Sequence, residues 1–589
     1  MMTLKTRWAD EAMCDLPLKE YPRPQMVRDC WMNLNGMFDF AITDYDENEW
    51  CDDYKYQIRV PFAVESCLSG VCKRVDADDM LWYSKKFTLT GDFKGKRVLL
   101  HFEAVDWKCK VFVNKQEVGE HIGGYNPFCF DITDKLTDGE NTLTVRVWDP
   151  TDASWQNRGK QASESHGFWY TSTSGIWQTV WLEGVNEDYI SSYRLTPDID
   201  EGVLKIATDV KGEGALRIKV FDGDKLVNEA EITADDKVAV PDAKLWSPED
   251  PFLYDFVLEL VKDGKAVDSV KGYFGMRKFS IGEHEGYARL FLNNKPYFQK
   301  GLLDQGYWSD GGMTPPPEEA MIYDIQKMKD LGFNMLRKHI KVESHRWYYL
   351  CDKIGMLVWQ DMVSGGKALN LFHAGVLPNI HGTLNPFIYL TKKDNAYKTF
   401  NRDKIEWRVQ FEEEYEEMID NLYNFTSICC WVPFNEGWGQ FDAKRIGDWT
   451  KQKDPSRFCD HASGWYDQKG ADFRSMHKYI LPVILPKYDG RPIVLSEYGG
   501  YSHNIEGHVW NFSKSFGYQM YNSKDALTKA YRNLHEKQII PNIKKGLSAT
   551  VYTQVSDVEF EVNGMLSYDR ELVKLHEDVV RELNEKMTF

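Results

Sequence analysis

Residues 428–438 read Ile-Cys-Cys-Trp-Val-Pro-Phe-Asn-Glu-Gly-Trp, a short apolar run that passes directly into Glu436. Residues 492–499 read Pro-Ile-Val-Leu-Ser-Glu-Tyr-Gly and run in the same way into Glu497. Continuous apolar runs of this length, bounded by turn residues, are typical of strands buried on both faces of a parallel sheet. Both stretches therefore predict parallel strands that each deliver a carboxylate at the carboxyl end.

The chain around these two stretches alternates apolar strands with helical segments from about residue 293 onward. Between the first two strands, for example, Met321, Ile325 and Met328 follow helical spacing. Such alternation predicts a parallel sheet, and eight units in roughly 300 residues match a (β/α)8 barrel, also called a TIM barrel. The eight predicted strands are residues 297–303, 334–340, 356–362, 428–436, 457–461, 474–477, 492–497 and 547–555.

The part of the chain before the barrel has the pattern of all-β domains. Short alternating runs such as residues 96–103 and 141–148 are separated by Gly, Asn and Asp turns, which predicts a sandwich or jelly roll. Shorter repeats of the same pattern follow and fit an immunoglobulin-like sandwich. We therefore expect a jelly-roll domain over residues 1–185, an immunoglobulin-like β-sandwich over 186–285 and a catalytic (β/α)8 barrel over 286–589.

The net charge of the chain limits the classes of partner that we expect it to bind. The 589 residues include 90 acidic and 72 basic side chains, for a formal net charge of −18. Such a field repels nucleic acids and anionic membrane surfaces, so neither is expected as a partner. Aromatic residues make up 14% of the chain; they suit the stacking of sugar rings, although β-rich domains also carry many aromatics.

Compartment and redox state are expectations from composition. The first residues lack the apolar stretch of a secretory signal, and no run of ~18 apolar residues predicts a membrane span. The eleven cysteines form no CxxC pair, and Cys429 and Cys430 lie inside an apolar run. Free buried thiols in a reducing, cytoplasmic compartment are therefore expected.

The two strand-end glutamates suggest the chemistry. Barrel enzymes carry their reactive groups at the carboxyl ends of strands, so Glu436 and Glu497, after the fourth and seventh strands, are expected to face one pocket. Retaining glycoside hydrolysis uses such a pair, one carboxyl group as acid/base and the other as nucleophile. A single glutamate after an apolar strand is usually a solvated strand end, but two in this arrangement favour catalysis.

The chain resembles glycoside hydrolase family 2 over nearly its whole length. Phe434-Asn435-Glu436-Gly437-Trp438-Gly439 is similar to the family's acid/base motif, and Ser496-Glu497-Tyr498-Gly499-Gly500 to its nucleophile motif. The resemblance implies Glu436 as general acid/base and Glu497 as nucleophile. Further matches to the family's jelly-roll and middle domains are residues 31–36, 60–66, 82–83, 121–128, 174–182, 245–251 and 275–277.

The resemblance also implies substrate-binding roles. Asn435 would hold the 2-hydroxyl of the sugar, Arg337 would keep Glu497 ionised, and Tyr479 would donate a hydrogen bond to the nucleophile. The glycone is the sugar on the non-reducing side of the cleaved bond. The candidates for contacts to its hydroxyls are His339, Asp304 and Asp361, and those for a stacking floor are Trp465 and Tyr552. A structural hydrogen bond or a place in the core is the alternative for each.

Two segments depart from the pattern of better-known relatives. Residues 337–343 read Arg-Lys-His-Ile-Lys-Val-Glu instead of an Arg-x-Ser-His-Tyr-Pro pattern, and residues 303–308 replace an Asn-x-His segment. Both would line the glycone site, so the exact sugar stays open. The β-glucuronidases of the family hold the sugar carboxylate with an Asn-x-Lys motif after the eighth strand. The corresponding stretch here has no Lys, because Asn563 is followed by Gly and Met; an Asn522-Ser523-Lys524 string lies before that strand, where chance is the simpler explanation.

The function expected from these observations is hydrolysis of terminal β-D-galactosides, or of close relatives such as α-L-arabinopyranosides, with retention. The alternatives are a β-glucuronidase or β-mannosidase of the same family and, in a different class, a catalytically inactive carbohydrate-binding protein. No nucleotide-binding loop indicates a cofactor, and a divalent metal stays open. The carbohydrate substrate is the expected partner, and family analogy favours a homo-oligomer. Residues 149–161 either reach over the barrel mouth or form an ordinary surface loop.

Overall fold

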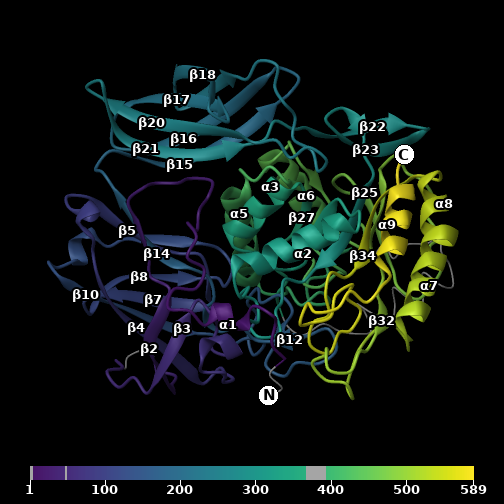
Figure 1. Ribbon diagram of the computed structural model, residues 1–589, viewed down its shortest axis with the longest axis horizontal. Helices are drawn as coiled ribbons and strands as arrows, with labels where there is room; N and C mark the ends of the chain where they lie inside the picture. Colours follow the sequence, from purple (N-terminus) through teal and green to yellow (C-terminus); the bar gives the residue numbers. More distant parts are fainter. Residues whose placement is uncertain (1–3, 47–49, 367–392) are drawn as a thin grey trace.

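The computed structural model describes residues 4–46, 50–366 and 393–589 (Figure 1). Three β-rich or barrel units follow one another along the chain, and the immunoglobulin-like unit lies at the top of the view, alongside both others. No helix in these ranges has the length and apolarity to cross a membrane. The eleven cysteines are free thiols, and Cys429 and Cys430 are fully buried.

The first unit is a jelly-roll-like sandwich of two antiparallel sheets. Its strands form because apolar residues alternate with polar ones, as in β7 (Lys108–Val113), where every second side chain is buried. The six-stranded sheet has the order β3-β2-β4-β10-β7-β8 and the four-stranded sheet the order β1-β14-β5-β9. The other strands are β1 (Trp31–Asn33), β2 (Gly36–Asp44), β3 (Tyr56–Val60), β4 (Asp79–Thr88), β5 (Arg97–Phe102), β8 (Gln116–Ile122), β9 (Phe128–Asp131), β10 (Glu140–Trp148) and β14 (Val180–Val185).

The second unit is a smaller sandwich, as the sequence predicts. Its sheets have the orders β15-β16-β19 and β18-β17-β20-β21. The predicted boundary at residue 285 falls in the turn between β22 (Phe279–His284) and β23 (Tyr287–Leu292), which pair as one hairpin. The strands of the sandwich are β15 (Tyr189–Asp198), β16 (Val203–Lys211), β17 (Ala215–Asp222), β18 (Lys225–Ile232), β19 (Asp235–Ala239), β20 (Tyr254–Lys262) and β21 (Lys265–Phe274).

The third unit is the predicted TIM barrel. Its curled parallel sheet has the order β29-β28-β27-β26-β25-β34-β31-β30, and all eight predicted strands are confirmed, with ends that shift by a few residues. Strands β26, β27, β28, β31 and β34 are buried along their whole length, because barrel side chains fill one face and helices cover the other. The strands are β25 (Gln299–Asp304), β26 (Met335–Lys338), β27 (Leu357–Asp361), β28 (Ile428–Val432), β29 (Phe458–Cys459), β30 (Arg474–Lys478), β31 (Ile493–Gly499) and β34 (Leu547–Thr553).

The helices pack around this sheet (Figure 1). In α2 (Glu318–Asp330) the predicted apolar residues Met321, Ile325 and Met328 are buried, and Pro317 occupies the N-cap position. The other main helices are α3 (His345–Ile354), α5 (Ile405–Leu422), α6 (Ala443–Lys453), α7 (Lys524–Leu534) and α9 (Glu577–Lys586).

Candidate active site

Glu436 lies just past β28 in a turn that holds it in an uncommon backbone conformation. Its φ is +53°, and Gly437 follows with φ +74°. Left-handed φ is unfavourable for a residue with a Cβ and persists where surrounding contacts fix it, often at functional sites. Here the Glu436 amide donates to the carbonyl oxygen of Ser463 at 2.9 Å. The turn therefore aims the side chain, which is 25% exposed, into the barrel mouth.

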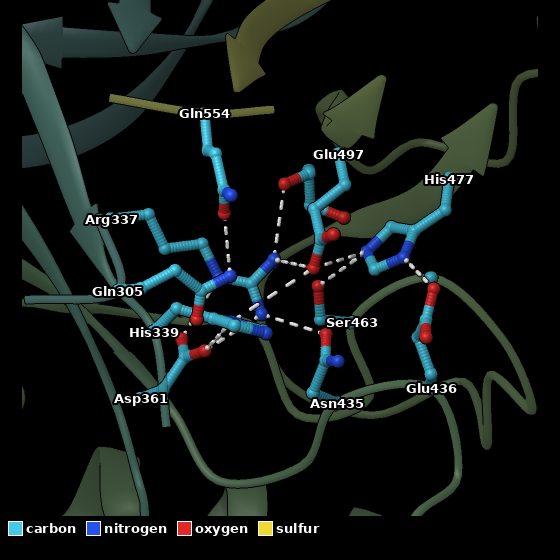
Figure 2. Close-up of polar contacts among 12 residues, drawn as sticks. Gln305, Arg337, His339, Asp361, Asn435, Glu436, Ser463, His477, Glu497 and Gln554 are labelled. Carbon is cyan, nitrogen blue, oxygen red and sulfur yellow. Dashed lines mark hydrogen bonds and ion pairs between the residues drawn. The ribbon is translucent and has the colours of Figure 1, made fainter. Parts of the chain in front are cut away.

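Glu497 is reached through an irregular strand. The pairing of β31 with β34 shifts register between Leu495 and Tyr498, and such bulges change the direction in which a side chain points. The Glu497 side chain is 5% exposed. One carboxylate oxygen of Glu436, one of Glu497 and a ring nitrogen of His477 all lie within 4.8 Å of one another. The two predicted carboxylates therefore meet in one site (Figure 2).

Tyr479 connects the two carboxylates. Its hydroxyl lies 2.6 Å from Glu497 Oε2 and 3.1 Å from Glu436 Oε1. The ring of Tyr518 stacks on Tyr479, with centroids 4.1 Å apart. A hydroxyl has one proton to donate, so Tyr479 can donate to only one carboxylate at a time.

Arg337 organises the floor of the site from β26 (Figure 2). Its fully buried guanidinium donates to both carboxylate oxygens of Asp361, at 2.9 and 3.0 Å. It also donates to Glu497 Oε1 at 3.1 Å and to Asn435 Oδ1 at 2.9 Å. The planar fork of arginine supports such multiple contacts. Arg337 thus fixes the side chains delivered by β27, by β31 and by the turn after β28.

The electrostatic environment keeps Glu497 ionised. Burial by itself would raise the pKa of Glu497, but His477, His339 and Arg337 outweigh it and lower the pKa to about 2. Burial, assisted by Lys160, holds the pKa of His339 well below its usual value. Arg337 is the permanently charged group among these three, and it contacts Glu497 directly at 3.1 Å.

His477 contacts the acid/base candidate directly and is not among the predicted site residues. Its Nδ1 lies 2.7 Å from Glu436 Oε1 and its Nε2 lies 3.1 Å from Ser463 Oγ (Figure 2). His477 precedes Tyr479 by two residues, and residues two apart on a strand face the same side. That spacing was a usable signal in the sequence.

Two other predicted residues lie close to this centre. His339 Nδ1 lies 2.8 Å from Asp361 Oδ2 and 4.0 Å from Glu497 Oε1. Trp465 is half-buried, and its ring centroid is 6.0 Å from that of His477. Because Arg337 and His339 occupy both carboxylate oxygens of Asp361, Asp361 orients these two residues in the structure.

Asp304 and Tyr552 point elsewhere than the sequence interpretation placed them. Asp304 Oδ2 accepts a hydrogen bond from the buried ammonium of Lys338 at 2.8 Å. Lys338, the last residue of β26, lies between Arg337 and His339 in the sequence, so its side chain faces away from theirs and holds Asp304 on that side. The Tyr552 ring packs against Tyr498, and the other rings around it are Tyr531 and His535, at the end of α7. Tyr552 therefore belongs to the packing between sheet and helix.

The pocket above the carboxylates is completed by the jelly-roll unit. It encloses about 560 Å³ of empty space, including the part open to solvent. Lys160, Phe168 and Trp169 line it together with Glu436 and Glu497. No periodic pattern marks Phe168 and Trp169 in the sequence, so only the folded chain reveals them.

The segment that carries Lys160 is fastened to the barrel mouth. The backbone amides of Arg158 and Gly159 both donate to the carbonyl oxygen of Ser364, just after β27, at 3.1 and 2.9 Å. Tyr125 Oη donates to the Arg158 carbonyl at 2.8 Å. The first of the two interpretations of residues 149–161, a loop that reaches over the barrel mouth, is confirmed.

Glu436, His477 and Glu497 are also the one group in the described ranges whose donor atoms converge closely enough for a metal ion. The two ring nitrogens of His477 point in different directions, one to Glu436 and the other to Ser463. Hydrogen bonds thus account for this geometry.

A (β/α)8 barrel with paired glutamates at the ends of strands four and seven, preceded by two β-sandwiches, defines the class of barrel glycosidases. Three family profiles match consecutive parts of the chain: the sugar binding domain of glycosyl hydrolases family 2 at residues 32–184, the family 2 domain at 189–277 and the family's TIM barrel domain at 285–589. The chain belongs to glycosyl hydrolases family 2.

The curated relatives include proteins named β-galactosidase and proteins named β-glucuronidase. A β-galactosidase of Priestia megaterium is 24% identical over 528 residues, which cover 85% of this chain and 47% of the relative. A β-glucuronidase of Bacteroides fragilis is 27% identical over 424 residues, covering 65% of this chain and 54% of the relative. The chain thus spans about half the length of the curated relatives it matches.

Solved structures share the fold. A β-glucuronidase from an uncultured Clostridium species superposes with a TM-score of 0.73 at 16% identity, covering 96% of this chain and all of the other. A β-galacturonidase from Eisenbergiella tayi, bound to galacturonate, superposes with a TM-score of 0.71 at 19% identity, covering 97% of this chain and all of the other. At such identities the likeness establishes the architecture alone.

Proposed function

We propose that the protein is a retaining exo-β-glycosidase that hydrolyses terminal β-D-galactosides. The observation that carries the proposal is the approach of Glu436 and Glu497, whose nearest donor oxygens lie within 4.8 Å. Retaining enzymes hold their carboxyl groups ~5–5.5 Å apart, whereas inverting enzymes need ~6.5–9.5 Å to admit a water molecule between them. The spacing in this site supports direct attack by a carboxylate.

In the first step a carboxylate oxygen of Glu497 attacks the anomeric carbon. The bond from that carbon to the aglycone oxygen breaks, and Glu436 donates its proton to the leaving oxygen. In the second step Glu436 removes a proton from water, and the resulting nucleophile attacks the same carbon. The ester to Glu497 is released, and two inversions give net retention.

The neighbouring groups suit these roles. Arg337 stabilises the Glu497 carboxylate before attack, and Tyr479 donates to it at 2.6 Å. Asn435 would face the 2-hydroxyl of the sugar, a contact that strengthens in the transition state. Its amide is oriented for this by the 2.9 Å bond from Arg337 to Asn435 Oδ1, because that bond fixes which end is the acceptor and leaves the amino group to the pocket.

A β-D-uronide, in which the sugar C6 is a carboxylate, is the second candidate, and Lys160 favours it. The Lys160 ammonium approaches the rings of Phe168 and Tyr170 at 5.8 and 5.7 Å. The described residues offer it no hydrogen bond or ion pair, so it is available to a ligand anion. Opposing this, Glu561 also lines the pocket, and the stretch after the eighth strand lacks the Asn-x-Lys motif of β-glucuronidases.

The decisive experiment measures turnover of a panel of 4-nitrophenyl β-glycosides: galactoside, glucoside, mannoside, glucuronide and galacturonide. We expect the galactoside to give the highest kcat/KM, and proton NMR of the first product to show the β-anomer. Glu497→Ala and Glu436→Ala are each expected to lower kcat by ~10³-fold or more. Normal turnover by Glu497→Ala, or a first product of α configuration, would reject the mechanism.

A further inference from the structure

A second cavity, of about 440 Å³, lies between the jelly-roll unit and the barrel. Three parts of the chain build it: the jelly-roll segments around residues 63–74 and 164–173, the first barrel loop at 307–312, and the late segments 510–514 and 559–568. Its size falls within the range of small-molecule sites. It is distinct from the catalytic pocket, because the two have no lining residue in common.

The two hollows lie back to back. Phe168 and Trp169 line the catalytic pocket, while Ser165 and Thr171, on either side of them in the sequence, line the second cavity. The same alternation occurs after β34, where Glu561 faces the catalytic pocket and residues 559–560 face the second cavity. Tyr170 forms the partition: it is fully buried, and its hydroxyl donates to the Glu561 carboxylate.

The lining combines aromatic faces with hydroxyl groups. Trp510 is half-buried at the cavity, with its ring centroid 5.9 Å from that of Tyr568, and Trp308 contributes a further face. Ser165 and residues 171–173 contribute hydroxyls from the jelly-roll unit. Aromatic rings bind the C–H faces of sugars, and hydroxyls match their O–H groups.

The charges in the cavity favour a neutral ligand. Burial raises the pKa of Glu65 to about 8, although hydrogen bonds from Ser174 oppose the shift. Glu65 therefore carries a proton near pH 7. Burial likewise raises the pKa of the lining residues Asp310 and Glu559. At the rim, Arg74 is paired with Glu164, and Lys514 is exposed to solvent. A cavity whose buried acids are held toward their protonated forms, with its unpaired cation out in solvent, favours hydroxyl groups over ions.

We propose that this cavity is a second carbohydrate-binding site, which holds a neutral part of an oligosaccharide next to the catalytic pocket. Trp510 provides its stacking face. The inference rests on the proposed glycosidase function, because that function makes the neighbouring pocket a centre that cleaves sugars. It is independent of which sugar is cleaved.

The test uses the full chain carrying Glu497→Gln, so that bound oligosaccharide is not turned over. Isothermal titration is carried out with neutral tetrasaccharides of β-linked galactose, glucose and mannose. We expect at least one of them to bind, and Trp510→Ala to weaken its affinity about tenfold, as for loss of one aromatic contact. Phe512→Ala is the matched control, since Phe512 lies on the same segment, is 53% exposed and does not line the cavity.

Ser165→Trp places a large side chain in the cavity from the jelly-roll unit and is expected to abolish the same binding. Introduced into the protein that retains Glu497, the same substitution should leave turnover of a 4-nitrophenyl glycoside within about twofold. Affinities that neither Trp510→Ala nor Ser165→Trp alters, or no binding of any of the three tetrasaccharides, would overturn the proposal. If the protein is not a glycosidase, the parent protein with Glu497 intact turns over no aryl glycoside. That result is distinct from a failure of the binding-site proposal.

Discussion

His477 Nδ1 lies 2.7 Å from Glu436 Oε1, so an imidazole from β30 contacts the carboxylate that follows β28. The ring is held from its other side by Ser463 Oγ at 3.1 Å. His477 therefore orients the carboxyl group that has to deliver and then recover a proton.

Replacing His477 by Phe is expected to lower kcat ~10²-fold, within the range for losing support of a general acid/base, with a much smaller change in KM. The pH dependence of kcat should change as well, since Glu436 loses its partner. Trp465→Phe is the control, because Trp465 is near the same ring but touches neither carboxylate in the described contacts. An unchanged pH profile in His477→Phe would contradict the assigned role.

In the first step, the transfer of the sugar to Glu497, Glu436→Ala is expected to lose much less activity on a 2,4-dinitrophenyl glycoside than on a methyl glycoside. A dinitrophenolate leaves without protonation, so the missing acid costs little there, whereas an alkoxide needs the proton. Stopped-flow measurement of the dinitrophenolate burst checks this. Equal losses on both substrates would show that Glu436 is not the acid.

The low pKa of Glu497 predicts a specific acid sensitivity. The pKa is lowered from 4.5 to about 2, so the folded protein favours the ionised form. The stabilisation is complete above pH 4.5 and is lost as the pH falls through the window from 4.5 to 2. Its size is about 3 kcal/mol from a shift of this order. Urea unfolding should show the stability advantage of the parent over Glu497→Gln shrinking across that window; a constant difference would refute the assignment.

Lys160 tests the choice between neutral and acidic sugars. Lys160→Met is expected to lower kcat/KM for the β-galacturonide about tenfold or more, the value of one charge-assisted contact, and for the β-galactoside less than about threefold. Lys160→Arg keeps the charge and should retain most of the galacturonide activity. Equal losses on both substrates would show that Lys160 does not meet a sugar carboxylate.

Gly499 is predicted to be intolerant of a side chain. A Cβ at this position, where φ is +83°, would lie 2.3 Å from the Tyr552 ring. Gly499→Ala should therefore cost ~3 kcal/mol or more and displace the strand that carries Glu497. Gly490→Ala, with φ +96° and no atom within 4 Å of the new Cβ, should cost only ~1–2 kcal/mol, for backbone strain. Thermal unfolding compares the two, and similar Tm losses would refute the packing argument.

The sequence was sufficient for the barrel and for its two glutamates, because apolar runs and strand-end carboxylates are local patterns. Which face a strand-end side chain occupies depends on register, and a single shift reverses it. For this reason the sequence interpretation placed Asp304 and Tyr552 in the pocket. In the structure, Asp304 accepts a hydrogen bond from Lys338 on the other side of the sheet, and Tyr552 packs against Tyr531 of α7. Phe168 and Trp169 reach the pocket through a long-range contact that has no periodic signature.

Because the backbone of residues 158–159 is hydrogen-bonded to Ser364, the walls of the active-site pocket come from two units of the chain, the jelly roll and the barrel. A barrel without the jelly-roll unit would keep both glutamates. The pocket would lose the wall formed by Lys160, Phe168 and Trp169 and would open to water on that side. Exchange of the amino-terminal unit between homologous enzymes would therefore change this wall and leave Glu436 and Glu497 in place.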